Sequence, residues 1–232
     1  MSSGIYLPEI EVFSQLDPSQ FEDFYTTFQA DFRVTDGAPY VSEVESGTAS
    51  GHELVLMKNA ALVAAEVILQ PVHEDLHAHL GLSSGDSVMH SGLSFDRHTA
   101  LPGQPYLDFA MGWHTDGSTP GEVDVRVDSK DGSEILQGEI PQELLDDLEQ
   151  KTGFIFTTGD DAEIETFAKE FEPIYRYYDD ETLIRLGLSW AQPIAGAAYI
   201  LRGTHIHRSP VNRSSRPRTR SSLSSTYTAV RG

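Results

Sequence analysis

From residue 86 onward the chain consists of short runs in which apolar and polar residues alternate, separated by turn residues. Alternation with a period of two is the pattern of a β-strand with one buried and one polar face. Many short strands of this kind indicate a β-sandwich or β-barrel. The strands are expected at 88–95, 106–113, 122–127, 134–140, 153–157, 197–202 and 221–230.

The N-terminal third has a different pattern, because its apolar residues recur at helical spacing. Asp17 is a suitable N-cap, Pro18 suits the first helical position, and Phe21 and Phe24 begin an apolar stripe that predicts a helix over 18–32. The resulting class is α+β, mainly β with helices. We expect a single domain over 1–232, with 1–50 as a helical and loop extension packed on it. Further helices are expected at 71–80, 141–151 and 161–171.

Two connections can also be predicted. Lys130-Asp131-Gly132-Ser133 separates two strand-like runs, which is typical of a β-hairpin. Residues 98–104 are expected to form the loop between the strands at 88–95 and 106–113.

Composition excludes several classes of protein. The chain of 232 residues has no cysteine, which excludes disulfides, cysteine-ligated metals and a cysteine nucleophile. The net charge of −20 argues against binding to nucleic acid or anionic membranes. Neither a signal peptide nor a membrane-spanning stretch is recognisable, so we expect a cytoplasmic protein with a small-molecule substrate. The oligomeric state is left open.

Charge is distributed unevenly along the chain. Residues 201–232 carry seven of the sixteen Lys and Arg residues and none of the 36 acidic residues. The basic segment 201–232 is therefore suited to binding anions, whereas the acidic remainder of the chain repels them. A disordered basic tail is the simplest alternative, but the strand-like run at 221–230 argues against it. An RNA-binding arm would conflict with the acidic body.

A histidine and an aspartate follow the expected strand at 106–113. His114 ends this strand and Asp116 returns to the same face two residues later, while Gly117 permits a sharp turn. One imidazole and one carboxylate would thus reach a single metal ion. His73 and His77, four residues apart on an expected helix, form a rival pair. An exposed polar helix face is the better interpretation of that pair.

A second histidine leaves the apolar run at 197–202, and an arginine enters the last strand 11 residues later. These residues are His207 and Arg218. Two antiparallel strands joined by such a loop would bring both side chains to one cavity. Two imidazoles and one carboxylate form the facial triad of non-haem Fe(II) oxygenases, which leaves positions open for a chelating 2-oxo acid and O₂. A planar guanidinium suits the distal carboxylate of 2-oxoglutarate.

The order His-x-Asp, distant His, then Arg resembles the Fe(II)/2-oxoglutarate-dependent dioxygenases. The stretch 207–218, with Ser209, Asn212 and Ser214, resembles more narrowly the phytanoyl-CoA dioxygenase-like branch. The resemblance covers 106–117 and 198–228. It implies a double-stranded β-helix (jelly-roll) core, Fe(II) held by His114, Asp116 and His207, and 2-oxoglutarate held by Arg218.

Two alternatives stay open at this site. His205 can replace His207, which stretches the spacing to the arginine to 13 residues, and Arg220 can replace Arg218. The spacing favours His207 and Arg218.

The expected activity is a 2-oxoglutarate-dependent oxygenase that uses Fe(II), 2-oxoglutarate and O₂. Hydroxylation of an unactivated C–H bond in a small metabolite or amino-acid derivative is the default outcome, and desaturation or ring formation is also open. Asp116 argues against halogenation, because halogenases of the resembled family carry a small residue there. The rivals are a cupin-type metalloenzyme that needs no 2-oxoglutarate and a non-enzymatic anion-binding module.

Overall fold

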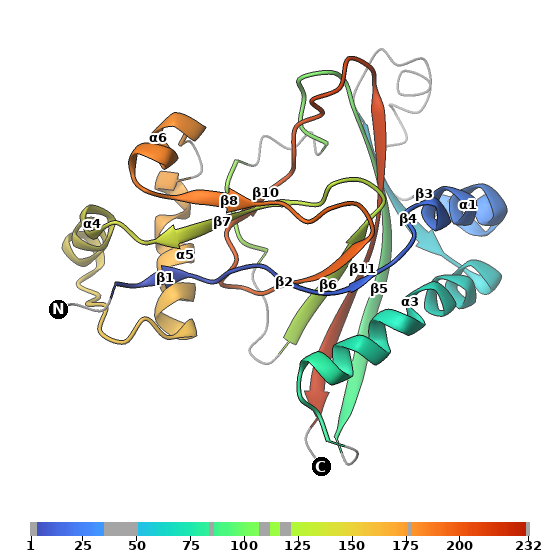
Figure 1. The fold of residues 1–232 in the computed structure, drawn as a ribbon, viewed down its shortest axis with the longest axis horizontal. Coiled ribbons are helices and arrows are strands. Elements are labelled where there is room, and N and C mark those ends of the chain that lie inside the picture. Colours follow the sequence, from blue (N-terminus) through green and yellow to red (C-terminus); the bar gives the residue numbers. More distant parts are fainter. Residues whose placement is uncertain are drawn as a thin grey trace.

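Two antiparallel sheets lie next to each other, and helices lie on the side of each sheet that is remote from the other (Figure 1). The computed structural model describes residues 4–34, 51–83, 86–106, 112–116, 122–175 and 178–230. The curled sheets are consistent with a jelly-roll core, and the expected α+β class is confirmed. The seven-stranded sheet has the order β2 (Glu11–Gln15), β9 (Ala197–Leu201), β6 (Glu122–Asp128), β11 (Arg218–Val230), β5 (Ser87–Ala100), β4 (Gly51–Met57) and β3 (Phe32–Val34).

The smaller sheet has four strands. β7 (Glu134–Glu139) pairs with β1 (Tyr6–Leu7), β10 (His207–Arg208) and β8 (Ser189–Ala191). A buried ion pair fixes the short strand β10, because Arg208 contacts Glu134 at 2.6 Å and its guanidinium lies 4.3 Å from the centre of the Trp113 ring. This arrangement matters for function, since His207 belongs to β10.

The alternating pattern of β6 shows how the large sheet separates two environments. Val123, Val125 and Val127 are buried in the apolar core, whereas Asp124 and Arg126 alternate with them on the other face. The apolar face is covered by α1 (Ser19–Phe28) and α3 (Asn59–His79). The polar face is therefore left to line the space between the two sheets.

The helix α3 is longer than the sequence indicates. We expected a helix at 71–80 and assigned no structure to 60–69, but both parts form one helix with Pro71 inside it. Ala61, Ala65, Leu69, Val72 and Leu76 form its buried stripe, and burial of this stripe against the sheet outweighs the cost of the internal proline.

A second apolar core lies beyond the small sheet. Helices α4 (Gln142–Thr152), α5 (Asp161–Tyr175) and α6 (Asp180–Arg185) cover it. The helices expected at 141–151 and 161–171 are confirmed as α4 and α5.

Three local expectations are wrong. The strands flanking 130–133 do not form a hairpin, because β6 joins the large sheet and β7 the small one. The turn instead carries the chain between sheets, with Gly132 donating to the Pro193 carbonyl at 2.8 Å. Residues 153–157 form no strand, since the amide of Thr157 at their end donates to the side chain of Glu163 at 2.9 Å. β5 continues through Ala100 into the segment expected to be a loop.

Some expectations fall partly outside the described residues. Of the strand expected at 106–113, residues 107–111 are not described, nor is Gly117. Of the expected extension 1–50, residues 4–34 are described, and they contribute β1 to the small sheet and β2 and β3 to the large one. Among the described residues no helix has the length and apolar character needed to cross a membrane.

Candidate metal centre

His114 and His207 lie side by side because their backbones form an isolated antiparallel bridge. The amide of His114 donates to the carbonyl of His207 at 2.9 Å, and the reverse bond is 2.8 Å long. The ring centroids are 4.5 Å apart, and both residues are buried. Residues 93 positions apart in sequence are thus fixed as neighbours by main-chain geometry.

Asp116 completes the cluster. One carboxylate oxygen lies 3.5 Å from Nε2 of His114, and the other lies 3.2 Å from Nε2 of His207. One ligand atom from each of the three residues lies within 4.8 Å of the others, a separation that a single metal ion can bridge. Hydrogen bonds from His114 and His207 hold the pKa of the Asp116 carboxyl well below its usual range. The aspartate is therefore an ionised ligand.

The backbone orients both imidazoles in the same way. Nδ1 of His114 lies 2.9 Å from the carbonyl oxygen of Gly112, and Nδ1 of His207 lies 3.1 Å from that of His205. A carbonyl only accepts, so each Nδ1 carries a proton, and each Nε2 is the ring nitrogen that faces Asp116. Nε2 is therefore the atom through which each histidine would bind a metal ion.

His205 has a different task. Its Nδ1 accepts a hydrogen bond from the amide of Arg202 at 2.9 Å, and its Nε2 lies 3.3 Å from the carbonyl of Glu9. Burial lowers the pKa of His205 to about 4, so the ring is neutral. Both ring nitrogens are engaged away from Asp116, and the structure brings His207, not His205, into the cluster.

The two candidate arginines occupy contrasting positions. Arg218 is exposed at the start of β11. Arg220 is only 1% exposed, and its Nε and Nη1 have no hydrogen-bond partner among the described residues. Its Nε lies 3.6 Å from the buried carboxylate of Asp128, and its guanidinium lies 5.5 Å from the centre of the Tyr106 ring. Because Arg220 is buried and has unused hydrogen-bond donors, it is better suited than Arg218 to bind an anion inside the protein.

Asn212 and Ser214 organise the loop that precedes β11. The Asn212 side chain donates to the carbonyls of Ala100 and Arg216, both at 2.8 Å, and accepts from the hydroxyl of Ser214 at 2.7 Å. The matched residues of the sequence motif therefore position the strand that carries the arginines.

Sequence reasoning missed Arg126, which lies on the polar face of β6. Its Nη1 lies 3.5 Å from the hydroxyl of Ser133, while its Nε is buried without a hydrogen-bond partner among the described residues. Burial alone would lower the pKa of Arg126, but nearby acidic groups such as the Asp128 carboxyl raise it above its usual value. An arginine between Asp124 and Asp128 in an alternating strand was the available signal.

A pocket of about 370 Å³ opens beside Asp116. It lies on the inner face of the large sheet, and its wall is polar: Ser94 and Ser224 share a hydrogen bond of 2.6 Å, and Thr226 donates to Asp124 at 2.6 Å. The remaining lining residues are Gly92, Leu93, Arg126 and Leu201.

The rival histidines of α3 do not form a second centre. His73 packs edge-on against Tyr227 and lies 5.9 Å from the ring of His90. In the described part of the chain, the only group of three or more metal-binding side chains is His114, Asp116 and His207.

Comparison with known proteins gives limited information. No protein-family description and no curated protein matches the sequence. Among solved structures, similarity is found to HygX from Streptomyces hygroscopicus with nickel, 2-oxoglutarate and hygromycin B bound. The identity is 12%, the match covers 97% of this chain and 83% of that chain, and the TM-score is 0.40.

Two further solved structures are similar at the same level. The non-heme monooxygenase ThoJ in a nickel complex is 12% identical, with coverage of 97% and 74% and a TM-score of 0.41. The non-heme alpha-ketoglutarate-dependent carbocyclase SnoK is 12% identical, with coverage of 98% and 82% and a TM-score of 0.46. The match to AviO1 from Streptomyces viridochromogenes spans 56% of that protein.

Proposed function

We propose that the protein is an Fe(II)/2-oxoglutarate-dependent oxygenase. The observation that carries the proposal is the meeting of His114, Asp116 and His207, with both Nε2 atoms and the carboxylate turned toward one point. Two imidazoles and one carboxylate are the ligand set of non-haem Fe(II) oxygenases.

The donor set fits an iron ion in both chemistry and protonation. Two imidazoles and one carboxylate would supply three protein ligands to an iron ion, with further positions available to 2-oxoglutarate and O₂. Iron bound there would supply the activation of O₂ that couples conversion of 2-oxoglutarate to succinate and CO₂ with oxidation of a C–H bond. The three side chains hold the metal, and the carbonyls of Gly112 and His205 keep the rings oriented.

Arg220 is the residue we assign to the distal carboxylate of 2-oxoglutarate. A buried guanidinium with two unused donors is costly unless a ligand satisfies them, and a carboxylate pairs with the planar fork at two points. Asp128 cannot fulfil this role completely, because it already accepts from Tyr199 at 2.7 Å and from Ser222. Arg218, which the sequence spacing favours, lies at the surface.

The substrate is expected to be a small polar metabolite. The pocket beside Asp116 is small and lined by hydroxyl and charged groups, and such a wall recognises hydroxyl or amino substituents rather than a hydrocarbon chain. Hydroxylation is the default reaction. A polar wall does not suit a long acyl chain. The resemblance to the phytanoyl-CoA dioxygenase-like branch therefore supports only the arrangement of residues 207–218 and not an acyl-CoA substrate.

Succinate release tests the proposal. The purified protein, supplied with Fe(II), 2-oxoglutarate and O₂ across a panel of small polar metabolites, is expected to form succinate only when all three components are present. Turnover that persists without 2-oxoglutarate would favour a cupin-type enzyme using the same ligands. Absence of Fe(II) binding in an anaerobic titration would contradict an enzyme of either kind.

A further inference from the structure

A second and larger pocket lies away from the triad, at the end of the large sheet where β11 begins. Its volume is about 920 Å³, within the range of small-molecule sites. Tyr106, Pro210, Asn212 and Thr219 form part of the wall that faces the interior, and Tyr106 also stacks against the buried Arg220. The pocket is therefore distinct from the cavity beside Asp116, with which it shares no lining residue.

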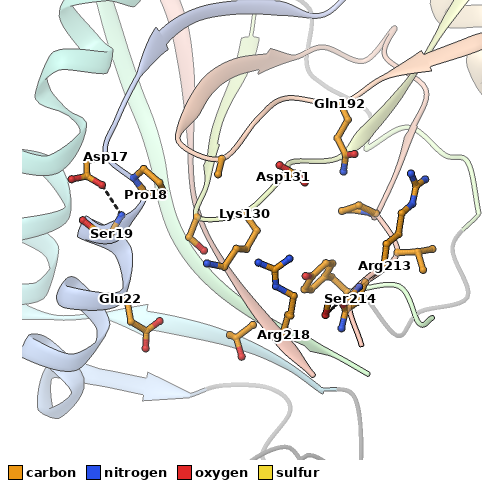
Figure 2. Close-up of a pocket in the computed structure, with 17 residues that line it drawn as sticks. Asp17, Pro18, Ser19, Glu22, Lys130, Asp131, Gln192, Arg213, Ser214 and Arg218 are labelled. Atoms are coloured by element: carbon orange, nitrogen blue, oxygen red, sulfur yellow. Dashed lines mark hydrogen bonds between the residues drawn. The ribbon is translucent and has the colours of Figure 1, made fainter. Parts of the chain in front are cut away.

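Two cations reach into this pocket without partners. Figure 2 shows the side chains of Lys130 and Arg218 extending into its centre from different elements, the turn after β6 and the start of β11. Neither makes a hydrogen bond or ion pair with any residue in the described parts of the chain. Arg213 lines the same pocket but pairs with Glu134 at 3.0 Å. Unpaired cations that converge are unexpected in a protein with a net charge of −20.

We propose that this pocket binds the phosphate group of a small phosphate monoester. Such a group carries close to two negative charges at neutral pH, which matches the two unpaired cations. A guanidinium engages phosphate oxygens at two points, and an ammonium adds a mobile point charge.

The opposite wall limits what the rest of the ligand can be. Asp17, just before α1, and Glu22, in its first turn, lie across the pocket (Figure 2). Asp17 accepts from the amide of Ser19 at 2.9 Å, and Glu22 lies 3.5 Å from Arg97, so contacts within the protein hold both side chains in place. They favour hydroxyl donors and repel a second anionic group. The expected ligand is a hydroxyl-bearing monophosphate rather than a diphosphate or a nucleic acid.

Calorimetric titration of the full-length protein with glucose 6-phosphate tests the proposal, with glucose and inorganic phosphate as separate probes. We expect glucose 6-phosphate to bind at low salt, phosphate to bind more weakly, and glucose not to bind. Arg218→Met and Lys130→Met should each weaken binding by about 10-fold or more. Arg216→Met is the matched control, since it removes the same charge from the same segment outside the pocket and should leave binding unchanged.

Three results would overturn the proposal. The first is no binding of glucose 6-phosphate to the wild-type protein. The second is an equal loss of glucose 6-phosphate affinity in Arg216→Met and Arg218→Met, which would indicate a general charge effect. The third is displacement of bound glucose 6-phosphate by 2-oxoglutarate, together with loss of binding of both compounds in Arg218→Met. That result would make this pocket the 2-oxoglutarate site. The titration needs neither iron nor turnover, so its failure leaves the proposed oxygenase function untouched.

Discussion

The histidines of this chain show that burial and spacing alone do not identify a metal ligand. His114, His205 and His207 are all buried, but only His114 and His207 turn Nε2 toward Asp116. The difference lies in the backbone groups that surround each ring. Carbonyls accept from Nδ1 of His114 and His207, whereas an amide donates to Nδ1 of His205.

The first prediction separates these histidines. His114→Ala and His207→Ala should each abolish tight Fe(II) binding and activity, because each removes one of three protein ligands. His205→Ala should retain the metal and lose activity only in part, since the carbonyl of residue 205 remains available to His207. The measurement is anaerobic Fe(II) titration. Loss of the metal in His205→Ala alone would refute the assignment.

The second prediction concerns the arginines of β11. Arg220→Met should raise the apparent constant for 2-oxoglutarate about 10- to 150-fold, the range expected for a charge-assisted contact worth about 1.5–3 kcal/mol. Arg220→Lys should have a smaller effect, because the charge is kept and the fork is lost. Fe(II) affinity should stay near wild type in both variants.

Arg218→Met serves as the control in the same assay and should leave the 2-oxoglutarate constant near wild type, since this side chain is exposed. The opposite pattern, with Arg218→Met impaired and Arg220→Met normal, would return the cosubstrate site to the residue favoured by sequence spacing.

At the scale of elements, the helix α5 shows how a local feature replaces an expected strand. The carboxylate of Glu163 accepts from the amides of Thr157, Thr158 and Gly159 at 2.7–3.1 Å and from the Thr157 hydroxyl at 2.8 Å. These amides are consequently unavailable to a sheet. The aromatic and β-branched residues at 153–157 predicted a strand, because the sequence pattern does not reveal where backbone donors are used.

This glutamate gives a prediction for stability against pH. Burial raises the pKa of Glu163, but the backbone hydrogen bonds outweigh it and lower the pKa to about 2. The stabilisation is therefore complete above the unfolded value near 4.5 and is lost as the pH falls toward 2.

Glu163→Gln should reduce the free energy of unfolding by about 1–3 kcal/mol at neutral pH. The difference from wild type should shrink below pH 4.5 in denaturant unfolding. Glu165→Gln, which removes only a surface contact with Lys169, is the control. A difference that grows on acidification would contradict this interpretation.

The packing of α3 gives a further prediction at the same scale. Leu69 is 1% exposed in the core between α3 and the large sheet, so Leu69→Ala should lower the free energy of unfolding by about 2–5 kcal/mol. Val67 lies on the opposite face of the helix and is 64% exposed. Val67→Ala should change stability by less than about 0.5 kcal/mol. Equal effects of the two substitutions would show that α3 does not pack as described.

At the scale of the whole molecule, sequence patterns predicted the α+β class and the strands β5, β6, β7, β9 and β11, but neither the shorter strands nor which strands share a sheet. The hairpin expected around Gly132 failed because a turn signal defines a change of direction and not the pairing that follows. His114 and His207 were identified because each ends a recognisable apolar run. The roles of Arg126 and Arg220 could be recognised only from their burial in the structure, because alternation in the sequence does not show which face of a strand turns inward.

The central claim is that one metal ion and one 2-oxoglutarate molecule share the space between the two sheets. Anaerobic calorimetric titration of 2-oxoglutarate, with and without Fe(II), tests it without knowledge of the substrate. We expect one 2-oxoglutarate to bind per chain when Fe(II) is present. The affinity for 2-oxoglutarate should be at least about 10-fold weaker when Fe(II) is omitted or when His207 is replaced by alanine. An affinity for 2-oxoglutarate that is the same with and without the metal would contradict it.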